Sequence, residues 1–219
     1  MDIRRPKHNP FKLVQMFEDE VADYTGAPYA VSVDNCTNAI FLCLRYIKEK
    51  NFIEKAEPVT IPSKTYLSVP QSIIHAGFLP VFDTRPETND WKGVYQLKPY
   101  PIMDAAKRFT SGMYVPGNFM CLSFHIKKHL KIGKGGMILT DDIEAVKWFK
   151  KARYEGRSEK LYHEDDIDSL GWNMYMTPQQ AAHGLSLMQN YPLHVPDLGE
   201  NDGYRDLTDF SVFKNHKRI

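Results

Sequence analysis

Short apolar runs of strand length alternate along this chain with longer segments of helical spacing. The helical pattern is clearest over residues 10–24, where Phe11, Val14, Phe17 and Val21 recur every three or four positions. Further helices are expected from about residue 38 and over 68–75, 143–154 and 178–189. Strands are expected over 30–33, 59–61, 79–82, 100–103, 119–122 and 137–139. This alternation predicts an α/β fold, with a mostly parallel sheet flanked by helices on both faces.

Composition narrows the class of protein. The chain has 219 residues, enough for one large domain or two small ones, and 42% of them are hydrophobic, so a substantial core can form. The 28 basic and 27 acidic side chains leave a net charge of +1. Proteins that bind nucleic acids or anionic membranes in general rely on excess basic charge. We therefore expect neither kind of partner.

Cysteine usage and the N-terminal sequence point to a cytoplasmic protein. Cys36, Cys43 and Cys121 are too few and too scattered for a disulfide framework, and none has metal-ligand spacing, so no metal site is expected. The first ten residues are polar and lack the apolar segment of a signal peptide. No apolar run approaches the length that spans a membrane.

A lysine-bearing segment joins the last two expected strands. Lys127 and Lys128 follow the apolar run 119–122, and glycines at 133, 135 and 136 precede the run 137–139. The pattern predicts a strand, a loop with both lysines, a tight turn and a second strand. A lysine beside a buried strand end can be kept partly neutral, and a neutral amine is a nucleophile toward aldehydes. The alternative is a pair of solvated lysines.

Polar residues follow several of the expected strands. In open α/β sheets, ligands bind at the carboxyl ends of the strands, so these residues predict a ligand site. A purely structural role is the alternative for these residues. Thr37 would then be a helix N-cap, Asp104 would cap a helix starting at Ala105, and Tyr66 would be part of the core. The polar groups are Asn35-Cys36-Thr37, Lys64-Thr65-Tyr66, Asp104, and Ser123 with Lys128.

The lysine segment, Ser-Phe-His-x-x-Lys followed by a Gly-Gly pair, resembles the Schiff-base segment of the DegT/DnrJ/EryC1/StrS family of pyridoxal-phosphate (PLP) sugar aminotransferases. Other blocks are similar to that family and occur in its order, from about residue 11 to residue 189. They are 17–44, 61–84, 101–107 (PIMDAAK) and 171–189. The resemblance implies the large domain of a fold type I PLP transferase over 1–190. Residues 191–219 are then a polar C-terminal extension rather than a complete small domain.

The resemblance also implies roles for individual residues. Counting from Ser123 makes Lys128, rather than Lys127, the lysine that forms the Schiff base with PLP and later moves a proton. Asp104 keeps the pyridine nitrogen protonated, so that the ring remains an electron sink. The implied cofactor-binding set is Cys36, Thr37 and Ser123 at the phosphate, Tyr66 stacked on the ring, Lys107 near the phenolic oxygen, and Asn173, which reaches the phosphate of the neighbouring subunit.

This chain departs from the family pattern at three residue positions and in its C-terminal part. The family commonly has Gln at the position of Lys107, an acidic residue at Lys134 and Arg at Tyr175. It also continues into a smaller C-terminal domain that helps to enclose the substrate. His125 lies within the motif, and we expect a packed or hydrogen-bonded role for it rather than a catalytic one.

The implied function is transfer of an amino group, with glutamate as the expected donor, to a keto sugar carried by a nucleotide. A homodimer with shared active sites is implied as well. Two alternatives stay open. A related sugar dehydratase has histidine in place of the Schiff-base lysine, so Lys128 argues against it, although His125 and His129 lie nearby. A non-catalytic or PLP-binding remnant that acts through a partner subunit is favoured by the departures and the short chain.

Overall fold

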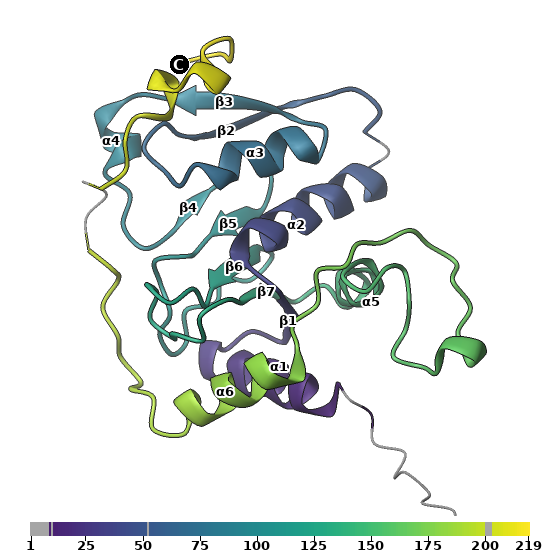
Figure 1. Ribbon diagram of the computed structural model, residues 1–219. Coiled ribbons are helices and arrows are strands. Elements are labelled where there is room, and N and C mark those ends of the chain that lie inside the picture. The colour runs from purple at the N-terminus through teal and green to yellow at the C-terminus, as the bar shows by residue number, and fades with distance from the viewer. Residues whose placement is uncertain (1–8, 10, 52, 200–202) are drawn as a thin grey trace, which may run out of the picture.

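The computed structural model describes residues 9, 11–51, 53–199 and 203–219 (Figure 1). The residues behind the expectation of no signal peptide, 1–8 and 10, lie outside that range. The helices are α1 (Lys12–Thr25), α2 (Cys36–Lys50), α3 (Ser68–His75), α4 (Pro86–Asn89), α5 (Ile143–Ala152) and α6 (Pro178–Met188). The strands are β1 (Tyr29–Val33), β2 (Pro58–Pro62), β3 (Leu79–Asp83), β4 (Tyr95–Gln96), β5 (Ile102–Asp104), β6 (Phe119–Ser123) and β7 (Gly136–Thr140). Short 3₁₀ helices are η1 (Tyr162–Glu164), η2 (Leu207–Asp209) and η3 (Ser211–Phe213).

The strands form a mixed sheet. Five of them are ordered β1-β7-β6-β5-β4, and β2 pairs with β3. Two backbone hydrogen bonds of 2.8 and 3.0 Å between Thr60 and Lys98 connect the two parts. Within the described ranges, β4 and β7 run opposite to the other strands, so three of the five pairings are antiparallel.

The α/β fold class is confirmed, and most of the described strands point the same way, with β4 and β7 reversed. Parallel neighbours need a long crossover connection, whereas a hairpin needs only a short one. The chain between β4 and β5 is a tight turn at 97–101, and 124–135 forms a hairpin loop between β6 and β7. These two short connections reverse the chain and set the directions of β4 and β7.

Helices cover both faces of the sheet, as the sequence predicts. On one face, α2, α3 and α5 pack over alternate strand residues such as Val31, Cys121 and Ile138. On the other face, α1 and α6 pack over the strand residues that alternate with these, such as Met120 and Leu139. Both faces of the strands are therefore buried, which accounts for their nearly continuous apolar sequences.

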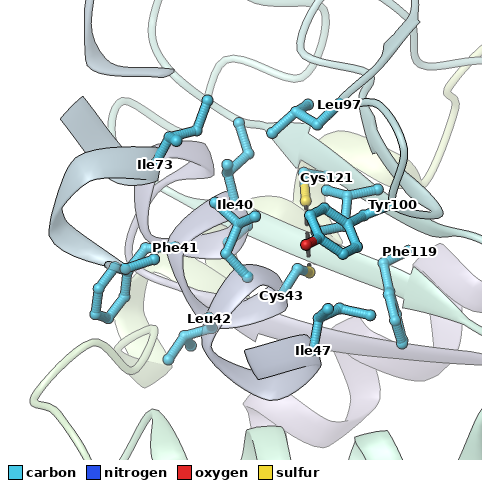
Figure 2. Packing of buried hydrophobic residues seen from close by; sticks show 14 of the residues in the cluster. Ile40, Phe41, Leu42, Cys43, Ile47, Ile73, Leu97, Tyr100, Phe119 and Cys121 are labelled. Atoms are coloured by element: carbon cyan, nitrogen blue, oxygen red, sulfur yellow. Dashed lines mark hydrogen bonds between the residues drawn. The ribbon is translucent and has the colours of Figure 1, made fainter. Parts of the chain in front are cut away.

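Figure 2 shows how α2 fills the first of these cores, with Ile40 and Ile47 on the side of the helix toward β5 and β6. All three cysteines are buried and unbonded to one another. Cys43 on α2 meets Cys121 on β6, with the two sulfur atoms 3.8 Å apart. These thiols serve as small apolar side chains in the helix–sheet contact.

The C-terminal arm, residues 193–199 and 203–219, lies along the side of the molecule from α6 to β3 (Figure 1). It begins at Leu193, whose carbonyl accepts hydrogen bonds from Ser111 and Thr110. It ends beside β3, where the backbones of Phe82 and Ile219 are joined at 2.9 Å. The arm is an ordered part of the fold rather than a loose extension.

Phe213 anchors the arm, because its side chain is 1% exposed and packs 5.6 Å from the ring of Phe82. We expect Phe213→Ala to lower the free energy of unfolding by about 3–5 kcal/mol, as for other buried aromatic truncations. The neighbouring Val212 is 64% exposed, so Val212→Ala should change it by less than about 0.5 kcal/mol. Urea unfolding of both variants tests this, and equal midpoints would show that Phe213 does not anchor the arm.

Candidate functional site

The candidate site lies at one edge of the sheet, where four strands that point the same way come to an end. β1 leads into Asn35, β2 into Thr65 and Tyr66, and β5 and β6 end at Asp104 and Ser123. Because these strands share a direction, their carboxyl ends meet at the same edge. The sequence prediction that these groups converge on one edge is supported by this topology.

Asp104 is the buried acid of the site, with only 4% of its surface exposed. One carboxylate oxygen accepts the Ala106 N–H at 2.9 Å, and the other accepts the Tyr95 hydroxyl at 2.8 Å. Burial raises the pKa of Asp104, while these two donors and the charge of Lys128 act in the opposite direction. No helix starts at Ala105, since the chain makes a turn there, so the helix-cap alternative for Asp104 is wrong.

Tyr95 is a site residue that the sequence analysis missed. Its hydroxyl lies 2.7 Å from that of Thr65 as well as beside Asp104, and all three side chains are buried. Since Tyr95 has one proton and donates it to Asp104, Thr65 must donate to Tyr95. The three groups form a directed chain of hydrogen bonds that holds the Asp104 carboxylate in place. Tyr95 belongs to β4, a two-residue strand with no clear pattern of its own.

We expect Tyr95→Phe to lower the free energy of unfolding by about 1–3 kcal/mol, because it removes a partner from two buried polar groups. The pKa of Asp104 should rise further, since a donor to its charged form is lost. Tyr162→Phe is the matched control, because Tyr162 is 75% exposed. Urea unfolding compares the two, and a Tyr95→Phe midpoint equal to that of the control would contradict the hydrogen-bonded chain.

The two lysines of the hairpin loop lie in different surroundings. Lys127 is exposed, whereas Lys128 is half-buried and its backbone N–H donates to the His125 carbonyl at 2.8 Å. Burial raises the pKa of both Asp104 and Cys36, and the positive charge of Lys128 opposes that rise. Lys128 is thus the lysine whose charge acts on the buried acid. The exposed His125 ring accepts the Lys127 N–H at 3.2 Å, so it has a hydrogen-bonded role.

The start of α2 forms a second part of the site. Asn35 caps the helix by accepting the Asn38 N–H at 2.8 Å, so the alternative that Thr37 is the cap is wrong. The first N–H groups of a helix have no partner within it, and here they belong to Cys36 and Thr37. The Thr37 hydroxyl lies 2.7 Å from that of Ser68. Together these groups offer an anion both N–H donors and hydroxyl donors.

Glycine at 136 permits this arrangement. A Cβ there would lie 2.5 Å from the Asn35 carbonyl carbon and 2.7 Å from the Cys36 nitrogen, well inside van der Waals contact. Only a residue without a side chain lets β7 approach the beginning of α2 this closely. The second glycine of the motif's Gly-Gly pair therefore has a packing reason.

The remaining candidate residues differ in how deeply they are buried. Ser123 is half-buried at the end of β6. Tyr66 is 56% exposed, so the alternative that it belongs to the core is wrong. Cys36 is buried, and burial raises the pKa of its thiol well above the ordinary value. Asn173 is exposed, and its amide donates to Glu155 at 3.0 Å.

The three departures from the family pattern have structural roles. Lys107 is buried with its ammonium 5.1 Å from the Trp91 ring. Lys134 forms an ion pair of 3.2 Å with Asp34 beside the start of α2. Tyr175 packs 5.1 Å from Tyr154, where it joins the aromatic core around α1.

These groups fit PLP. The start of α2 with its hydroxyls suits a phosphate, the buried Asp104 suits a protonated pyridine nitrogen, and the open face of Tyr66 suits an aromatic ring. Lys128, half-buried in the loop after β6, supplies an amine. The described residues contain no group of three or more His, Cys, Asp or Glu side chains placed to hold a metal ion. No helix in the described ranges has the length and apolar composition to cross a bilayer.

Solved structures with a similar fold are PLP-dependent aminotransferases. A putative PLP-dependent aminotransferase from Bacillus cereus has a TM-score of 0.73 at 16% identity, and the match covers 96% of this chain and 82% of that one. Helicobacter pylori PseC, an aminotransferase involved in pseudaminic acid biosynthesis, gives 0.67 at 19% identity, over 83% and 58%. These matches establish the fold type I class.

Sequence comparison identifies the family. The model of the DegT/DnrJ/EryC1/StrS aminotransferase family matches residues 8–99 and 100–195, and the chain belongs to that family. Spore coat polysaccharide biosynthesis protein SpsC of Bacillus subtilis strain 168 is 29% identical over 78% of this chain and 55% of its own length. GDP-perosamine synthase of Caulobacter vibrioides is 25% identical over 84% and 58%. The chain thus spans little more than half the length of these relatives.

Proposed function

We propose that the chain acts as a PLP-dependent sugar aminotransferase. The amino acceptor is a keto sugar carried by a nucleotide, and the donor is glutamate. The names of relatives support the sugar class: besides GDP-perosamine synthase, a 26% identical protein of Acidithiobacillus ferrooxidans is a UDP-N-acetyl-3-dehydro-α-D-glucosamine 3-aminotransferase. A similar solved structure, DesI, was determined with its TDP-sugar product.

One observation carries the proposal: the buried carboxylate of Asp104 at the end of β5 and the half-buried Lys128 in the loop after β6 lie at the edge of the sheet where α2 begins. An acid and an amine beside an anion-binding helix start are what PLP requires. Bound PLP would supply an electron sink. The protein's own residues would bind and orient the cofactor and move the substrate proton.

The residues divide these functions among them. The N–H groups of Cys36 and Thr37, with the Ser123 hydroxyl, bind the phosphate. Asp104 pairs with the protonated pyridine nitrogen, and Tyr66 restrains the ring from one face. Lys128 would hold the cofactor covalently. When it is free of the cofactor, its Nζ would act as the base that takes up and gives back the substrate proton.

A donor and acceptor screen tests this function. Purified protein is loaded with PLP, its absorbance is followed as glutamate and other amino acids are added, and products from a panel of nucleotide-linked keto sugars are identified by mass spectrometry. We expect glutamate to bleach the band and an aminated sugar to form. A band that persists with every donor would contradict transamination and favour a non-catalytic PLP-binding role. A dehydrated sugar would favour the dehydratase alternative.

We further propose a cytoplasmic homodimer with composite active sites, in which Asn173 reaches the phosphate bound by its partner. The exposed amide of Asn173 makes this feasible, and twofold dimers are the commonest homo-oligomers. An Asn173→Ala chain mixed with a Lys128→Ala chain should regain activity if subunits exchange, because one of the two mixed sites then has both residues intact. A monomer in sedimentation that binds PLP tightly would rule out shared sites.

A further inference from the structure

The described parts of the C-terminal arm contact the segments around the candidate site. Along the first part of the arm, His129 Nε2, next to Lys128, lies 2.9 Å from the Pro196 carbonyl, and the Leu198 N–H donates to the Lys107 carbonyl. Asp197 forms a two-point ion pair with Arg108, at 2.8 and 2.6 Å. The arm is therefore fixed to the two segments that follow β5 and β6.

The second part of the arm is fixed at the end of β2. The Leu207 N–H donates to the Ser63 carbonyl at 2.9 Å, and the Ser63 hydroxyl donates to Asp206 at 2.8 Å. Leu207 is buried, so this attachment includes an apolar contact as well as hydrogen bonds. It sets the position of Tyr204, three residues earlier, at the same edge of the sheet.

Tyr204 continues a set of aromatic rings that leads to Asp104. Its ring stacks on Trp91 with centroids 6.2 Å apart and planes at 20°, and the ammonium of Lys107 lies 5.6 Å from its centre. Trp91 in turn packs 4.7 Å from Tyr95, whose hydroxyl donates to Asp104. The half-buried Tyr204 thus belongs to the layer of side chains beside the buried acid.

Electrostatics agrees with this position. Burial raises the pKa of Tyr204 to about 12, and the charges that add to the effect are those of Asp104, Tyr66 and Cys36. These three residues are the ones assigned above to the ring nitrogen, the ring face and the phosphate. Tyr204 is consequently uncharged at neutral pH and keeps its hydroxyl proton.

We propose that Tyr204 forms a wall of the cofactor pocket on the side of Asp104, so that the C-terminal arm helps to enclose the PLP ring. This inference rests on the proposed function. Tyr204 stacks on Trp91, and Tyr66, the residue assigned to the cofactor's ring face, is 56% exposed. In this proposal Tyr204 lines the pocket and does not occupy it.

Equilibrium binding of PLP to the full chain tests the proposal. Loss of an aromatic wall should weaken binding about three- to tenfold in Tyr204→Ala, the range of one stacking contact. Tyr204→Phe keeps the ring and should bind within about twofold of the parent. Val212→Ala, an exposed position on the same arm, is the control and should bind as the parent does.

The outcomes separate the claims. If the parent binds PLP and Tyr204→Ala binds it equally well, Tyr204 is remote from the cofactor and the proposal is overturned. Tighter binding by Tyr204→Ala would also overturn it, because the phenol would then occupy the pocket. If the parent binds no PLP, the proposed function itself fails, and this inference fails with it.

A second measurement keeps the Tyr204 side chain in place. Fluorotyrosine placed at 204 should show a shifted ¹⁹F resonance when PLP is added, because the cofactor ring would lie beside it. The same label at the exposed Tyr162 should not respond. A resonance at 204 that stays constant while PLP binds would overturn the proposal even if Tyr204→Ala fails to fold.

Discussion

Lys128→Ala should reduce transamination by about 10²–10⁴-fold, the usual contribution of a positioned acid–base group. The variant loses both the covalent attachment of PLP and the amine that moves the substrate proton. PLP should still bind through the phosphate site at the start of α2, because those N–H groups are unchanged. Rates measured at saturating PLP separate lost chemistry from lost affinity.

Lys127→Ala is the matched control, since it removes an identical side chain one residue away. Lys127 is exposed, whereas the charge of Lys128 acts on Asp104 and Cys36. We expect the control to keep nearly the parental rate. If Lys127→Ala loses the activity and Lys128→Ala keeps it, the assignment of the two lysines is reversed.

Asp104→Asn should lower the turnover rate by about 10²–10³-fold, the cost typical of losing a preorganised electrostatic group. The amide keeps the shape of the carboxylate but cannot hold the pyridine nitrogen protonated. The affinity for PLP should change far less than the rate, because the phosphate contacts remain. Rates and cofactor affinity are measured on the same preparation.

Asp83→Asn provides the control for a buried carboxylate. Asp83 ends β3 and pairs with Arg85, which contributes most to lowering its pKa to about 2. This variant should lose stability and retain turnover. Near-parental turnover by Asp104→Asn would leave Asp104 with only the structural role of fixing the turn at Ala106.

Local patterns in the sequence were enough to predict most of the fold. α3 has the predicted bounds, 68–75, because its apolar face is periodic and Gly77 follows it. Asp104 and Lys128 could be assigned to one edge of the sheet because each follows a strand. The direction of β4 could not be predicted, since a two-residue strand has too few positions to show alternation.

Tyr95 and Tyr204 could not be identified from the sequence for a different reason. Their neighbours in the site, Asp104 and Trp91, are brought close by the turn after β4 and by the arm, which no local pattern records. The arm itself is polar and held by two separate buried residues, Leu207 and Phe213, in short 3₁₀ turns. Such spacing has no helical or strand period to detect.

Borohydride reduction of the PLP-loaded chain, followed by peptide mapping, tests the central claim most directly. Reduction converts the link between cofactor and lysine into a stable pyridoxyl mark, so the labelled peptide identifies the residue that held PLP. The account predicts a single mark on Lys128, with Lys127 unmodified. A mark on Lys127, or PLP bound without any reducible link, would contradict it.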